Sequence, residues 1–232
     1  MKKSKTRNLI TQLQISAWYM KNNCWIYIFL AIVFMVLLPL CGIIFRKNLA
    51  LDDYSLIYGY LIYIATTCVS VFGIVPILMY LHSTYHLKSG ECVRLMSGWR
   101  EKYQCRIWYL MMAVMLSELM LILGITYRRG VPKSDIIKDY VSLLVIVWVL
   151  YGATHFLTYL LKNVYFTFML IELYSIMFGI LKVGMDSVWN IYALQSLDGT
   201  VWMIDVILYI CLGISFEVLI DILDGLMRLR KI

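Results

Sequence analysis

Long, nearly unbroken runs of apolar residues alternate with short polar segments along this chain. Each run has about twenty residues, the length that an α-helix needs to cross the hydrocarbon core of a bilayer. The alternation predicts an all-α, polytopic membrane protein with six transmembrane helices in a single domain, residues 1–232. The predicted spans are Cys24–Phe45, Ile57–Leu81, Ile107–Thr126, Tyr140–Leu161, Val164–Leu181 and Val201–Ile220. Only Lys162 and Asn163 separate the fourth span from the fifth, so the chain must turn tightly there.

The composition agrees with this pattern. Hydrophobic residues make up 62% of the 232 residues and charged residues only 15%, whereas a soluble domain carries about 25% charged residues to wet its surface. Soluble enzyme folds and intrinsic disorder are therefore excluded. A transmembrane β-barrel is excluded as well, because its strands would alternate apolar and polar residues instead of forming long apolar runs.

The basic residues predict how the spans run. Fourteen of the 21 Lys and Arg residues fall in the N-terminal segment, between the second and third spans, in the turn after the fourth span, and in the C-terminal tail. These segments share one membrane face, and basic residues accumulate in cytoplasmic loops. We expect both termini to be cytoplasmic, and the net charge of +7 then reflects orientation in the membrane and not nucleic-acid binding.

Three segments outside the predicted spans have sequences that predict structured elements. Arg7–Lys21 has an apolar face and predicts an interfacial helix on the cytoplasmic leaflet, in contact with membrane lipid, although a tail without a fixed place is the alternative. His82–Arg106 is longer than a helical hairpin needs, so a structured element is expected there. Gly184–Thr200 mixes Trp189 and Tyr192 with polar residues, which predicts a re-entrant element at the outer face or, alternatively, an ordinary loop.

Familiar catalytic and cofactor motifs are missing from the sequence. It contains no GxxxxGK[ST] phosphate-binding loop, so any ATP that drives this protein must bind to another subunit. HExxH and GxSxG motifs are also missing. His82 and His86 share a helix face but have no third ligand at suitable spacing. We therefore expect no catalytic residues, no metal site and no cofactor in this chain.

Ionisable residues inside the predicted spans are the strongest functional candidates. Placing an ionised carboxylate at mid-membrane costs about 2–3 kcal/mol, so such residues face other helices, a polar cavity or a basic partner. Glu118 and Glu172 are near mid-span, and with His155 they are the candidates for a translocation path. The alternative for the two acids is a neutral, hydrogen-bonded carboxyl that joins neighbouring helices.

The last span ends in an acidic stripe. Glu217, Asp221 and Asp224 follow one another at helical spacing, with Arg228 further along the same face. Because this end is predicted to be cytoplasmic, the stripe is expected to pair with the basic segment between the second and third spans. A solvated helix end is the alternative.

Taken together, the interfacial helix, six spans, structured cytoplasmic loop and re-entrant segment resemble the permease subunits of bacterial ATP-binding cassette exporters of the compact type-2 class. The closest local match is KSGECVRLMSGWREK, Lys88–Lys102, which resembles the coupling helix that docks on the ATPase subunit in that family. Ser97, Gly98 and Trp99 stand where many relatives have a proline-containing turn. The contact candidates that the resemblance implies are Glu91, Arg94, Leu95, Trp99 and Arg100. A solvated basic loop that only sets orientation is the alternative.

The resemblance also implies the partners and the location. It implies a pair of permeases, identical or paralogous, in a bacterial plasma membrane, with ATP and magnesium held by two separate ATPase subunits. Small members of the class are similar to exporters of antimicrobial peptides and to bacteriocin self-protection systems. A proton-coupled carrier using Glu118 and Glu172 is the first alternative, although its two halves should show an inverted repeat and do not. A membrane enzyme using the acids and His155 is the second.

Overall fold

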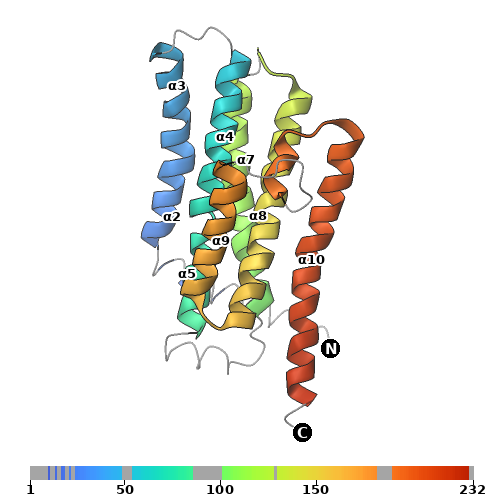
Figure 1. Ribbon diagram of the computed structural model, residues 1–232. Helices are drawn as coiled ribbons and strands as arrows, with labels where there is room; N and C mark the ends of the chain where they lie inside the picture. The colour runs from blue at the N-terminus through green and yellow to red at the C-terminus, as the bar shows by residue number, and fades with distance from the viewer. Residues whose placement is uncertain are drawn as a thin grey trace.

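The computed structural model describes five stretches of the chain and a few isolated residues near its start. The stretches are 24–48, 54–85, 101–127, 130–181 and 190–229, and the isolated residues are Ile10, Gln14, Ala17, Trp18 and Lys21. Within these residues every regular element is a helix and none is a strand (Figure 1). The predicted all-α class is therefore confirmed.

Within the described residues, five helices are long and apolar enough to cross a membrane. They are Cys24–Ile44, Tyr54–His82, Arg106–Tyr127, Lys133–Leu161 and Gly199–Leu223, and they correspond to the first four predicted spans and the last one. The predicted fifth span forms a shorter apolar helix, Val164–Ile180. The described part of the chain thus contains five helices of full spanning length and one shorter apolar helix.

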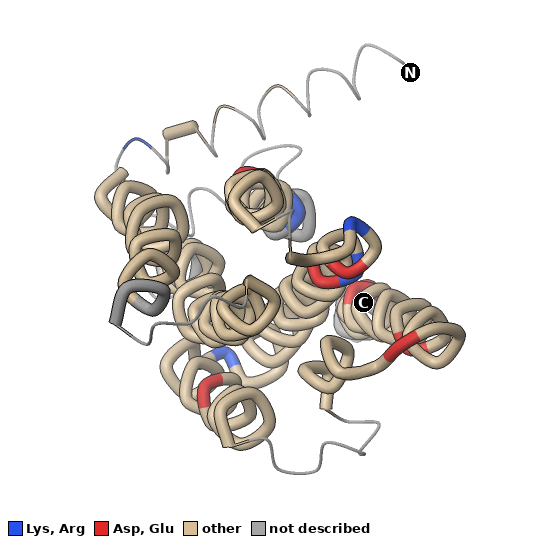
Figure 2. The backbone as a smooth tube through the Cα atoms, turned by 90° about the horizontal axis from the view of Figure 1, so that it is seen from above, with Lys and Arg blue, Asp and Glu red and all other residues tan. Residues whose placement is uncertain are grey.

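The first and the fifth of these six helices each contain a π-helical segment. The elements in chain order are α2 (Cys24–Ala31), the π-helix η1 (Ile32–Leu37), α3 (Leu38–Asn48), α4 (Tyr54–Phe72), α5 (Val75–Tyr85), α7 (Glu101–Tyr127), α8 (Lys133–Leu161), α9 (Val164–Tyr174), the π-helix η2 (Ser175–Ile180), the 3₁₀-helix η3 (Ile191–Gln195) and α10 (Gly199–Leu229). Successive long helices run in opposite directions and form one bundle (Figure 1). Seen from above, the described backbone carries few charged residues (Figure 2).

Helix α8 lies at the centre of the bundle, in contact with α4, α5, α7, α9 and α10. Its mid-section from Leu143 to Leu150 is apolar with hardly a break, and a helix that is apolar all round is stable only when other helices surround it. At opposite sides of the bundle lie α2 and α10 (Figure 1). Helix α10 exposes many large apolar side chains along its length, among them Ile204, Ile207 and Ile214, which is the surface that a lipid-facing helix presents.

The second span bends between α4 and α5. Pro76 follows the turn at Gly73 and Ile74, and proline has no amide hydrogen to continue the helical ladder. The Gly73 carbonyl, at the break, accepts a hydrogen bond of 2.8 Å from the Tyr151 hydroxyl of α8. The bend is thereby held against the central helix.

The tight turn predicted between the fourth and fifth spans is confirmed. Helix α8 ends at Leu161 and α9 begins at Val164. Lys162 adopts the left-handed conformation, with φ 51°, and its amide donates to the Thr158 carbonyl. Asn163 caps α9, because its side-chain oxygen accepts a hydrogen bond of 3.1 Å from the Phe166 amide. Two residues therefore reverse the chain and satisfy both helix ends.

Candidate functional site

A polar cavity of about 470 Å³ lies at the end of the bundle where α4 and α8 begin, the upper end in Figure 1. We call it the polar cavity. Its walls come from the first turns of α4 and α8, from η2, and from η3 with the residues that follow it. The lining residues are Ser55, Tyr58, Gly59, Ile62, Tyr63, Thr66, Gly130, Val131, Pro132, Asp135, Lys138, Asp139, Phe178, Gly179, Tyr192, Gln195, Ser196 and Asp198.

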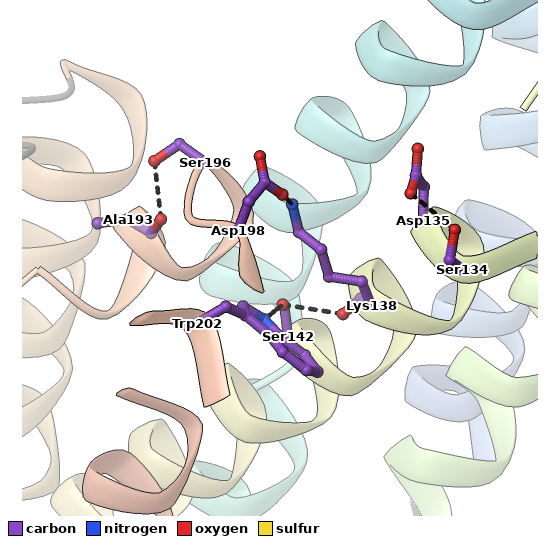
Figure 3. Close-up of polar contacts among 8 residues, drawn as sticks. All are labelled: Ser134, Asp135, Lys138, Ser142, Ala193, Ser196, Asp198 and Trp202. Atoms are coloured by element: carbon purple, nitrogen blue, oxygen red, sulfur yellow. Dashed lines mark hydrogen bonds and ion pairs between the residues drawn. The ribbon is translucent and has the colours of Figure 1, made fainter. Parts of the chain in front are cut away.

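The charged residues of the cavity come mainly from the start of α8. Asp135 and Asp139 are one helical turn apart, and Lys138 lies between them. Lys138 reaches across to form an ion pair with Asp198, which precedes α10 (Figure 3). Asp135 accepts a hydrogen bond of 3.1 Å from the Ser134 hydroxyl. The ion pair therefore joins the start of α8 to the start of α10 across the mouth of the cavity.

One wall of the cavity rests on η3, a short helix packed inside the bundle. Its residues Ile191, Tyr192, Ala193 and Leu194 are all buried. A buried segment of this kind must find partners for its free backbone groups. The Ile191 amide donates to the Tyr174 hydroxyl at 3.2 Å, and the Tyr209 hydroxyl donates to the Asn190 carbonyl at 3.2 Å. Side chains of α9 and α10 thus fix η3 from both sides.

Three further hydrogen bonds join η3 and α10 to the rest of the bundle. The Gln195 amide donates to the Thr66 hydroxyl of α4, and the Trp202 indole donates to the Ser142 hydroxyl of α8 at 3.0 Å (Figure 3). Tyr192 donates to the Ser175 hydroxyl at 2.9 Å. Burial raises the pKa of the Tyr192 phenol, so this group stays neutral and keeps its role as a donor. The hydrogen bonds of Tyr192 and Gln195 therefore hold η3, one wall of the cavity, in place.

A second polar group lies at the opposite end of the bundle. Arg106, in α7, binds Glu217 of α10 through two nitrogens, with Nε to Oε1 at 3.1 Å and Nη2 to Oε2 shorter still. His155 of α8 is buried and lines a very small cavity together with this pair. A two-point Arg–carboxylate contact fixes the angle between the two groups as well as their distance. The pair therefore locks the lower part of α10 to α7.

The three predicted path residues occupy three different surroundings. His155 lies beside the Arg106–Glu217 pair. Glu118 is exposed on the face of α7 that also carries the exposed side chains of Val114 and Leu121. Glu172, in α9, lies near Tyr192, and one of its carboxyl oxygens is buried without a hydrogen-bond partner among the described residues. Of the two cavities described here, only the small one is lined by any of them, and by His155 alone.

The acidic stripe is partly described. Glu217 is paired with Arg106, which belongs to the basic segment between the second and third spans, so this part of the predicted pairing is present. Asp221 is exposed on the next turn of α10. The side chain of Asp224 lies outside the described residues.

Several predicted features lie wholly or partly outside the described residues. The coupling candidates Glu91, Arg94, Leu95, Trp99 and Arg100 are outside them. Of the predicted interfacial helix, five residues are described, and each is helical and exposed. Of the predicted re-entrant segment 184–200, residues 190–200 are described, and they contain η3. The functional roles expected for these segments remain predictions.

The polar cavity was not predicted, because the sequence did not single out Asp135, Lys138, Asp139 or Asp198 as candidate site residues. One signal was available. Tyr58, Ile62 and Thr66 recur at helical spacing on α4, and the acids at 135 and 139 share one face of α8. Nothing in the sequence indicates that these two faces meet, because their contact depends on how α4 and α8 pack.

Comparison with protein-family models, with curated proteins and with solved structures gave no match. Among the described residues, no group of three or more His, Cys, Asp or Glu side chains is arranged to hold a metal ion.

Proposed function

We propose that this chain is the transmembrane subunit of an ATP-driven exporter in a bacterial plasma membrane. The observation that carries the proposal is the broken element before the last span. Helix α9 and η2 together, Val164–Ile180, are shorter than the five spanning helices, and the buried helix η3 packs against η2, α8 and α10. Transporters place such interrupted segments where they line a cavity, because the freed backbone groups need internal partners.

The surroundings of η3 support a transport role. Its backbone is satisfied by Tyr174 and Tyr209, and η2 and η3 both line the polar cavity. In this proposal α9 and η2 form the sixth crossing, shortened at the outer face, and both termini are cytoplasmic. The interfacial helix Arg7–Lys21 then lies on the cytoplasmic leaflet.

The proposal assigns energy coupling to partners. The sequence has no phosphate-binding loop, so ATP and magnesium belong to a separate ATPase subunit that docks on the segment Lys88–Lys102. A second permease copy, identical or paralogous, completes the transporter. The exposed Glu118 supports a protein neighbour for α7, since a carboxylate facing lipid is costly and its neighbours on that face are apolar.

The proposed substrate is an amphipathic, cationic peptide. The chain carries 14 Met and 18 Tyr residues, and flexible Met together with Tyr side chains suits apolar partners of varied shape. The acids of the polar cavity suit the basic residues of such a peptide.

One observation favours a second candidate, a proton-coupled carrier. The buried carboxyl oxygen of Glu172 has no hydrogen-bond partner in the described part of the chain, which is the setting of a carboxyl that binds and releases a proton. The two candidates differ in their need for an ATPase.

Co-purification tests the first candidate. We expect an ATPase subunit to remain bound when the chain is purified in mild detergent from its host membranes. Changing Glu91, Arg94 and Trp99 together to alanine should release the ATPase, because these residues are the proposed docking contacts. A matched variant with Lys88, Ser97 and Lys102 changed to alanine should keep it. Equal retention by both variants would disprove docking on this segment.

A further inference from the structure

The wall of the polar cavity carries more negative than positive charge. Among the described residues that line it, Asp135, Asp139 and Asp198 supply carboxylates, and Lys138 supplies the one ammonium group. Lys138 is already engaged by Asp198 (Figure 3). Lys138 also lies close enough to Asp139 to attract its carboxylate, so on the described wall three carboxylates share one ammonium group.

Tyr58 shows how one of these carboxylates is held on the wall of the cavity. Its side chain is only 4% exposed. Its hydroxyl is buried and lies against the Asp139 carboxyl. Buried hydroxyls nearly always have a partner, and Asp139 is the acceptor that this one faces. Tyr58 therefore helps to fix the position of the Asp139 carboxyl.

The remaining walls suit an organic cation better than a bare metal ion. Tyr58, Tyr63, Tyr192 and Phe178 line the cavity, and the faces of aromatic rings attract positively charged nitrogen. The acids do not converge as a metal-binding group would, as far as the described residues show. A volume of about 470 Å³ falls in the range of small-molecule sites.

We propose that the polar cavity binds a ligand through a protonated alkylammonium group, which the carboxylates of Asp135 and Asp139 and the aromatic walls recognise. The group can belong to a lysine side chain of a peptide or to a free small amine. Where the group belongs to a peptide, the inference rests on the substrate class of the proposed function. Binding at this cavity requires neither ATP nor an ATPase subunit, so its test can fail while the ATPase test succeeds, and the reverse.

Gly59 offers a sharp test of the proposal. It lines the cavity on α4, and a Cβ built on it meets no atom within 4 Å. Gly59→Phe should therefore fill the cavity without disturbing the helix, and Gly59→Ala should leave the cavity open. Asp139→Asn removes one recognising charge, and Asp205→Asn is its control, because Asp205 lies on α10 and does not line the cavity.

The measurement is the shift in thermal unfolding temperature of the purified full chain in detergent. The probes are 1,5-diaminopentane, a blocked Gly-Lys-Gly peptide, the same peptide with its lysine acetylated, and magnesium chloride. We expect an amine probe to raise the unfolding temperature of the wild type, Gly59→Ala and Asp205→Asn by several degrees. Gly59→Phe and Asp139→Asn should show no such rise.

The two amine probes separate the sources of the group. A rise with the lysine peptide alone indicates a peptide ligand, a rise with the diamine alone indicates a free amine, and either supports the proposal. The proposal is overturned if neither amine acts, if the acetylated peptide or magnesium acts equally well, or if Gly59→Phe keeps the full response.

Discussion

Replacing Gly213 with valine is expected to destabilise the protein by about 3 kcal/mol, the upper end of the usual cost of overpacking. Gly213 lies where α10 crosses α8, and a Cβ at this position would overlap the Trp148 Nε1 atom. Trp148 has little freedom to move. Its indole donates to the Ile210 carbonyl at 3.3 Å and packs edge-on against Tyr109 at 5.0 Å between ring centroids. The substitution must therefore push the two helices apart.

Unfolding of the purified protein in detergent, followed by circular dichroism, measures this effect. Gly59→Val is the matched control, because it makes the same chemical change in α4 where a Cβ meets no neighbouring atom. Valine is favoured over glycine within a helix by a few tenths of a kcal/mol, so the control should be neutral or slightly more stable. Equal stability of the Gly213→Val and Gly59→Val variants would show that α8 and α10 do not approach closely at Gly213.

Replacing Arg106 with alanine is expected to cost about 2 kcal/mol, the usual range for a lost hydrogen bond to a charged group. The Glu217 side chain is only 12% exposed, whereas that of Arg106 is 48% exposed. Removing the arginine therefore leaves an unpaired carboxylate that is largely shielded from water. An unpaired buried charge costs more free energy than the ion pair contributes to stability.

A double-mutant cycle separates pairing from the loss of side-chain packing. Arg106→Met with Glu217→Leu should be more stable than Arg106→Met alone, because the second change removes the stranded carboxylate. Chemical unfolding curves of the four proteins give the coupling energy. Simple additivity of the two single changes would mean that the Arg106–Glu217 contact contributes nothing to stability.

The helices were predictable because the physics that determines them is local. A run of apolar residues such as Tyr140–Leu161 has few alternatives to a buried or membrane-spanning helix, and α8 includes the whole of it. The turn at Lys162 and Asn163 was likewise set by the two polar residues between apolar runs. The short fifth helix was visible as well, because Val164–Leu181 is the shortest of the predicted spans and the helix found is Val164–Ile180.

The site was less predictable because it depends on packing between distant segments. Glu118, His155 and Glu172 share the property of being ionisable within a span, and this property alone grouped them. The structure places them in three different surroundings, because a residue's face on its own helix does not tell which helix will cover it. Asp139 and Tyr58 line the same cavity although they are 81 positions apart in the sequence. No periodicity in either segment predicts that the two residues come together.

Transport of a labelled cationic amphipathic peptide into inverted membrane vesicles tests the central proposal most directly. The vesicles contain the chain together with its co-purifying ATPase, and ATP or a proton gradient is supplied in separate experiments. The proposal predicts uptake that requires hydrolysable ATP and continues when an uncoupler collapses the proton gradient. Uptake by the chain alone, driven by a proton gradient without ATP, would contradict it.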